Sequence, residues 1–119
     1  MLLNNAAVLI VEDEPFIALD LALSVEDAGG IVIGPAATVA EALGFLGCEL
    51  RGAILDVHLP DGDVGPVLHE LMARRVPVLV QTGGGLPKCL REAYPDLPVL
   101  PKPNDPARLV ATLCKAIAK

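Results

Sequence analysis

The segment VLIVEDE, residues 8–14, contains the clearest structural signal of the chain. Its four aliphatic residues match a short buried strand, and three consecutive carboxylates follow at the point where that strand would end. Pro15 suits the first turn of a helix, and apolar residues then recur at helical spacing as far as Gly29. A buried strand, an acidic end and a helix together predict the first unit of an alternating β/α fold.

The same alternation continues through the rest of the chain. Further strands are predicted at residues 31–33, 53–55, 78–80 and 99–100, and further helices begin at Thr38, Val64, Pro87 and Asp105. Five such units predict a single α/β domain over residues 1–119. The expected architecture is a doubly wound, five-stranded parallel sheet in the flavodoxin-like order 2-1-3-4-5, with about five helices.

The composition excludes several classes of protein. With 53% hydrophobic residues the chain can bury a core, which excludes intrinsic disorder. Its three aromatic residues are too few for a stacking platform on single-stranded nucleic acid, and a net charge of −6 argues against direct binding to duplex DNA. No stretch is long and apolar enough for membrane insertion, and no basic signal region opens the chain. We therefore expect a cytoplasmic protein.

Two helices raise questions of burial. In the helix that begins at Thr38, the apolar spacing predicts that Val39, Leu43 and Leu46 point inward. The first helix carries a second apolar stripe in addition to its core-facing residues. This stripe consists of Phe16, Leu19 and Leu23. Either the helix is buried on a wider face, or the stripe is the contact surface of a homodimer.

Polar residues stand where the predicted strands end. Asp56 follows the third strand, Gln81 and Thr82 follow the fourth, and Lys102 follows the fifth. Ligands of doubly wound sheets bind beyond the carboxyl ends of the strands, at the point where the strand order reverses. Because the first and third strands are neighbours in the predicted order, Asp13 and Asp56 should converge there.

Converging carboxylates repel one another unless a cation lies between them. Mg²⁺ is usually held by one or two carboxylates together with water and phosphate oxygens, which Asp13, Asp56 and a nearby backbone carbonyl could provide. A solvated acidic rim is the alternative interpretation. Lys102 and Thr82 favour the metal site, because an ammonium group and a hydroxyl at the same edge suit an anion. The combination predicts phosphoryl transfer to a carboxylate.

Four segments resemble, in the same order, the motifs of the receiver domain of two-component response regulators. They are VLIVEDE at 8–14, ILDVHLPDG at 54–62, VQTG at 80–83 and PKP at 101–103. The resemblance covers nearly the whole chain. It implies that Asp56 is the phosphoacceptor.

The resemblance also implies roles for the other site residues. Asp13 would be a direct Mg²⁺ ligand, Glu12 would act on the metal through water, and the carbonyl of His58 would be the third protein ligand. Thr82 and Lys102 would contact the phosphoryl group. The bond from Lys102 to the following proline is expected to be cis.

The chain departs from the common receiver pattern at Val99, where most receivers have an aromatic residue that turns inward on activation. In this respect it resembles an alphaproteobacterial receiver subgroup that lacks the aromatic residue, in which the loop after the fourth strand is thought to carry the change. We therefore expect the response to phosphorylation in residues 82–104. This segment lies within the basic last third of the chain, residues 76–119, which suits an acidic partner surface.

These observations predict a signalling receiver that takes a phosphoryl group from a histidine kinase or phosphotransfer protein and then contacts an unidentified downstream protein. Such a domain promotes only its own phosphorylation and dephosphorylation and is not an enzyme acting on other substrates. One alternative is a receiver cut from a hybrid histidine kinase, acting as a phosphorelay or phosphate sink. A phosphorylation-independent adaptor and a phosphatase are the remaining alternatives.

Overall fold

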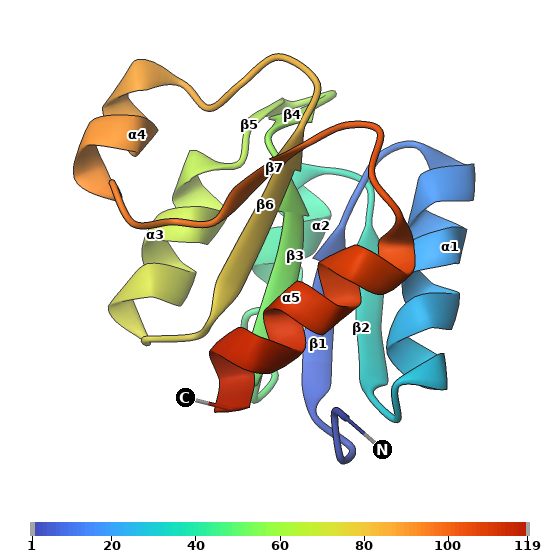
Figure 1. Cartoon of the computed structure of the whole chain (residues 1–119). Coiled ribbons are helices and arrows are strands. Elements are labelled where there is room, and N and C mark those ends of the chain that lie inside the picture. Colours follow the sequence, from blue (N-terminus) through green and yellow to red (C-terminus); the bar gives the residue numbers. More distant parts are fainter. Residues whose placement is uncertain (1, 119) are drawn as a thin grey trace.

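The computed structural model describes residues 2–118 and shows a parallel sheet between two layers of helices (Figure 1). The five strands follow the order β2-β1-β3-β6-β7, which is the predicted flavodoxin-like order. They are β1 (Ala7–Val11), β2 (Ile31–Ala36), β3 (Gly52–Asp56), β6 (Val78–Thr82) and β7 (Val99–Pro101). The helices are α1 (Pro15–Asp27), α2 (Val39–Gly44), α3 (Gly65–Ala73), α4 (Lys88–Ala93) and α5 (Pro106–Ala118). The sequence did not predict a small antiparallel hairpin, β4 (His58–Leu59) with β5 (Gly62–Asp63).

Two hydrophobic cores lie on opposite faces of the sheet. Successive side chains of a strand alternate between faces, so Val8 and Ile10 pack under α1 and α5, whereas Leu9 and Val11 pack under α2, α3 and α4. Figure 1 shows α5 crossing the sheet on the same side as α1. The three inner strands, β1, β3 and β6, are buried on both faces, and such strands appear in a sequence as continuous aliphatic runs.

Helix α2 is shorter than its apolar pattern suggested. It begins at the predicted cap, where Thr38 Oγ1 accepts a hydrogen bond from the amide of Glu41 at 3.0 Å, and it ends after six residues. Ala42, one turn after the cap, faces the sheet. Leu43 is rotated away and is 43% exposed, so the prediction that it points inward is wrong, whereas Leu46 beyond the helix is buried as predicted.

The second apolar stripe of α1 faces solvent. Phe16 is 77% exposed, Leu19 54% and Leu23 50%, because the buried face of the helix lies on the opposite side. The prediction that this stripe is buried within the chain is therefore wrong, and its role as a homodimer contact stays a prediction. Among residues 2–118, no helix has the length and apolar character that a membrane crossing requires.

The loop of the β4–β5 hairpin is anchored to α2 by one side chain. Asp61 accepts hydrogen bonds from the amides of Val39 at 2.8 Å and Ala40 at 3.0 Å. These two bonds hold the pKa of Asp61 below its ordinary value. Since the hairpin begins two residues after Asp56, this anchor fixes the chain where it leaves the sheet.

Gly30, in the turn between α1 and β2, provides a test of the core packing beside α1. A Cβ atom there would lie 2.6 Å from Leu3 Cδ1 and 2.8 Å from Val25 Cγ1. We expect Gly30→Ala to lower the free energy of unfolding by about 1–3 kcal/mol, the usual cost of overpacking, as measured by urea denaturation. Gly44→Ala is the matched control, because nothing lies within 4 Å of its added Cβ, and it should not be destabilising. Equal destabilisation of the two variants would contradict the close packing of the turn.

Candidate functional site

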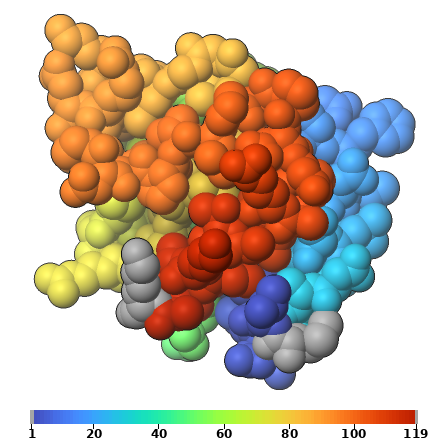
Figure 2. Space-filling view, viewed as in Figure 1, coloured from blue at the N-terminus to red at the C-terminus, as the bar shows by residue number. Residues whose placement is uncertain are grey.

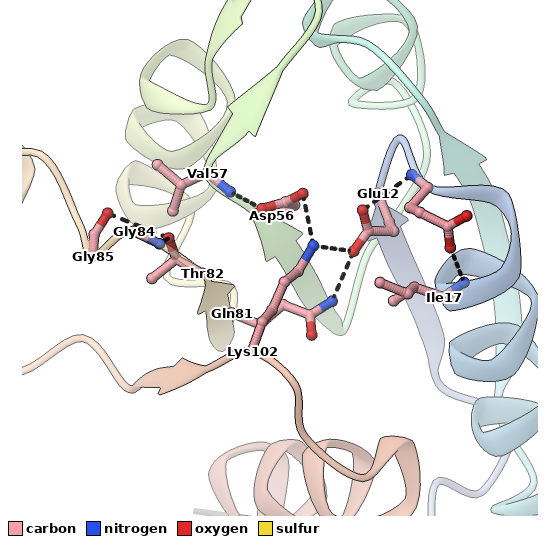
Figure 3. A network of polar contacts seen from close by, with 10 residues as sticks. Glu12, Ile17, Asp56, Val57, Gln81, Thr82, Gly84, Gly85 and Lys102 are labelled. Atoms are coloured by element: carbon pink, nitrogen blue, oxygen red, sulfur yellow. Dashed lines mark hydrogen bonds and ion pairs between the residues drawn. The ribbon is translucent and has the colours of Figure 1, made fainter.

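Four neighbouring strands each place one polar side chain at the same end and on the same face of the sheet (Figure 3). Glu12 follows β1, Asp56 ends β3, Gln81 lies in β6 and Lys102 follows β7. Each stands two residues after a side chain of the core under α1 and α5, namely Ile10, Ile54, Leu79 and Leu100. The pleat and the strand order thus bring together groups that lie far apart in the sequence.

Lys102 bridges the two buried carboxylates of this group. Its Nζ lies 2.7 Å from Glu12 Oε1 and 3.0 Å from Asp56 Oδ2 (Figure 3). Partial burial acts to lower the pKa of Lys102, but the hydrogen bonds and negative charges of Glu12 and Asp56 outweigh it and raise the pKa above its ordinary value. Lys102 is therefore an ammonium group held between two acids. The bond to Pro103 is cis, as predicted.

Glu12 is the most buried acid of the site. Its side chain is 0% exposed, and its second oxygen, Oε2, accepts a hydrogen bond from the amide of Glu14 at 3.1 Å. Burial raises the pKa of Glu12 to about 7, and the charge of Asp56 acts in the same direction, although the hydrogen bonds from Lys102 and Glu14 oppose it. Near neutral pH, Glu12 is therefore poised between its charged and neutral forms.

Three carboxylates converge in a way that suits a hard cation. One oxygen from each of Glu12, Asp13 and Asp56 lies within 4.8 Å of the other two. Asp13 is exposed, whereas the other two are buried, so the cluster opens to solvent on one side. Oxygen ligands of this kind fit Mg²⁺. His58 begins β4 two residues after Asp56, and the role of its carbonyl as a ligand stays a prediction.

Thr82 lies next to this group, but its hydroxyl binds the glycine loop that follows β6. Its hydroxyl donates a hydrogen bond to the carbonyl of Gly85 at 3.3 Å and accepts one from the amide of Gly84 at 3.2 Å (Figure 3). Within the described residues, the Thr82 hydroxyl makes its hydrogen bonds to this loop and none to Asp56. Asp56 Oδ1 instead accepts a hydrogen bond from the amide of Val57 at 2.8 Å.

Sequence reasoning placed Gln81 at a strand end but assigned it no role. The side chain is buried, and its Nε2 donates a hydrogen bond to Glu12 Oε1 at 3.2 Å. The available signal was a polar residue ending an otherwise aliphatic strand. Asp61 was missed for a different reason, because its partners on α2 are 21 and 22 residues away in the sequence.

Comparison with known proteins identifies the class of domain. No known family profile matches the sequence. The chain is 38% identical over 108 residues to the phyllosphere-induced regulator PhyR of Methylorubrum extorquens, a match that covers 87% of this chain and 37% of that protein. This chain thus spans little more than a third of that relative.

Two solved receiver domains match over nearly their whole length. The non-phosphorylated receiver domain of HemR from Leptospira biflexa is 26% identical, with a TM-score of 0.78, and the match covers 96% of this chain and 95% of that one. The receiver domain of the sensor histidine kinase PA1611 from Pseudomonas aeruginosa, described with a magnesium ion in its active-site cleft, is 24% identical, with a TM-score of 0.79 and coverages of 97% and 99%. The chain is a receiver domain of two-component signalling.

The burial of Glu12 predicts an unusual titration. In the metal-free protein its carboxyl group should titrate with a midpoint of about 7, compared with an unfolded value near 4.5. The folded state then holds this proton to higher pH than the unfolded state, so the stability that the group contributes is full below about 4.5 and is lost as the pH rises through about 7.

The ¹³C shift of the Glu12 carboxyl group measures the midpoint directly. Urea denaturation should show the wild type losing stability relative to Glu12→Gln as the pH rises through the same window. A midpoint at the unfolded value would show that burial does not control this acid.

Proposed function

We propose that this receiver domain accepts one phosphoryl group on Asp56 from a phosphohistidine of a histidine kinase or phosphotransfer protein. The observation that supports this best is the Lys102 ammonium group, which bridges Asp56 and Glu12 beside a cluster of three carboxylates. In the reaction an Asp56 carboxylate oxygen forms a bond to phosphorus, and the bond from phosphorus to the imidazole nitrogen breaks. The imidazole nitrogen keeps the electron pair of that bond and takes up a proton from water, which leaves an acyl phosphate on Asp56 and a neutral histidine on the donor.

The chain's own residues provide most of what this reaction needs. Asp13, Asp56 and the carbonyl of His58 would hold Mg²⁺, with Glu12 acting through water; when bound, the metal would neutralise charge on the carboxylates and on the incoming phosphoryl oxygens. Lys102 already contacts Asp56 Oδ2, so a short movement of its flexible side chain brings the ammonium group to a phosphoryl oxygen. We propose that this phosphoryl transfer takes place in the cytoplasm.

The readout depends on Thr82. Its hydroxyl is engaged with Gly84 and Gly85 in this structure, so a hydrogen bond to the phosphoryl group would withdraw it from the loop. Residues 83–98 have little to resist the change, because α4 has six residues, no side-chain cap and one buried residue, Leu90. Figure 2 shows α4 and its neighbouring segments (orange) standing out at one corner of the molecule, where a partner could reach them.

A second candidate is a receiver that works inside a longer chain. The PA1611 domain belongs to a sensor histidine kinase, and the PhyR relative is much longer than this chain. In that case the phosphoryl group on Asp56 would pass on to a phosphotransfer histidine. Transfer from the phosphorylated domain to such a protein, measured with purified components, distinguishes a relay from a receiver that signals by contact.

The acceptor can be identified by mass measurement. With acetyl phosphate and Mg²⁺, the wild type should gain one phosphoryl group, and Asp56→Asn should gain none because the amide is a poor nucleophile. Asp96→Asn is the control, since this exposed carboxylate lies outside the carboxylate cluster. Omission of Mg²⁺ should also prevent labelling, because the acids then repel the incoming anion. An Asp56→Asn protein that is labelled like the wild type would place the acceptor elsewhere.

The readout can be mapped with beryllofluoride, a mimic of the phosphoryl group. Amide NMR shifts should change most between residues 82 and 104, because the loop loses its anchor to the Thr82 hydroxyl. Thr82→Val should bind the mimic but leave residues 83–98 largely unshifted, whereas Thr82→Ser, which keeps the hydroxyl, should respond like the wild type. If the largest changes fall on α1 around Phe16 instead, the second apolar stripe is the readout surface.

A further inference from the structure

Gln81 is a buried polar side chain that the proposed function does not use. It is 2% exposed, and its backbone is held between two strands, paired with Asp56 on β3 and Leu100 on β7. Its side chain reaches across the site to Glu12 (Figure 3). A buried amide is costly unless its hydrogen bonds are made, so this contact gives the side chain a defined orientation.

Three hydrogen-bond donors hold the Glu12 carboxylate, and we expect only one of them to move when Asp56 is phosphorylated. Oε2 accepts from the backbone amide of Glu14, while Oε1 accepts from both Lys102 and Gln81. Lys102 is shared with Asp56 and is the group expected to turn towards a phosphoryl oxygen. Once it does, Gln81 is the side-chain donor that remains on Oε1.

The type of donor also matters for a cation site. A second ammonium or guanidinium group beside Glu12 would repel Mg²⁺, and an aliphatic residue would leave Oε1 dependent on Lys102 alone. A primary amide donates a hydrogen bond without adding positive charge. Gln81 also lines a cavity of about 100 Å³ together with Lys102 and the α1 residues Ile17 and Asp20.

We propose that Gln81 is a positioning residue that fixes Glu12 for its contact, through water, with Mg²⁺ and keeps it fixed after Lys102 moves to the phosphoryl group. This inference rests on the proposed function, because it assumes that the carboxylate cluster binds the metal. Gln81 touches Glu12 and acts through it. Partners that orient a ligand group in this way commonly strengthen metal binding by about 10–100-fold.

The test measures Mg²⁺ binding, and not phosphorylation, on the ¹⁵N-labelled protein. Mg²⁺ alone is titrated into the metal-free chain, and the amide signals of Asp13 and Val57 report the Kd. Gln81→Met keeps a similar volume but removes the donor, and we expect its Kd to be weaker by about tenfold, the lower end of the usual range because Glu12 acts through water. Leu79→Met is the matched control on the same face of β6, and its Kd should stay within about twofold of the wild type.

The wild type supplies a second readout that does not depend on any variant folding. Gln81 is the sole glutamine of the sequence, so its side-chain NH₂ signals can be assigned without ambiguity. They should shift along the same Mg²⁺ binding curve, and they should remain protected from solvent exchange when beryllofluoride and Mg²⁺ are added together.

The outcomes separate the two proposals. If wild type and Gln81→Met bind Mg²⁺ equally and the Gln81 signals do not move during the titration, Gln81 has no positioning role, although the phosphoacceptor function stands. If the wild type shows no Mg²⁺ binding, or if Asp56→Asn is still labelled by acetyl phosphate, the proposed function fails and the role of Gln81 fails with it.

Discussion

The Lys102 ammonium group, held between the buried carboxylates of Glu12 and Asp56, is the interaction on which the carboxyl end of the sheet depends. Two acids removed from water on neighbouring strands would repel each other and would be costly to bury unpaired. Lys102 offsets that cost from a third strand, and its own position is fixed because its amide donates to the carbonyl of Thr82 at 3.0 Å. A divalent cation bound to the same acids would neutralise their charge in place of Lys102. Metal binding would therefore leave the Lys102 side chain freer to move.

Strand β6 separates the two halves of the proposed mechanism. Gln81 and Thr82 are adjacent, so the pleat sends their side chains to opposite faces of the sheet. Gln81 joins the charged network with Glu12, while the Thr82 hydroxyl holds the glycine loop. In the proposed mechanism, phosphorylation of Asp56 therefore reaches the loop through the displacement of one hydroxyl group, and no large side chain has to move. This explains how the domain could respond with Val99 in place of an aromatic residue.

The segments on either side of the site differ in how firmly they are held. The chain that follows β3 is anchored twice, because Asp61 accepts hydrogen bonds from two amides of α2 and Asp63 accepts one from the amide of Gly65 at 2.7 Å. The chain that follows β6 has a glycine loop and a short helix with one buried residue. The proposed acceptor thus lies beside the more firmly held segment and the expected response in the less firmly held one, as a switch with a fixed reaction centre requires.

The β/α alternation and the residues at the strand ends could be predicted from the sequence, because buried parallel strands appear as uninterrupted aliphatic runs and the polar residues that end them stand out. The strand order was predicted as the common arrangement of five such units, and the structure confirms it. The order of the four motifs also pointed to Asp56, Lys102 and Thr82 as candidate site residues. Which of these groups contact one another became visible only in the folded chain. The bridge from Lys102 to Glu12 spans 90 positions of the chain and the contact from Gln81 to Glu12 spans 69, and no local pattern encodes the reach of one side chain across a neighbouring strand. The exposure of Leu43 and of the α1 stripe was likewise settled by packing, since helical periodicity identifies an apolar face but does not tell whether another element covers it.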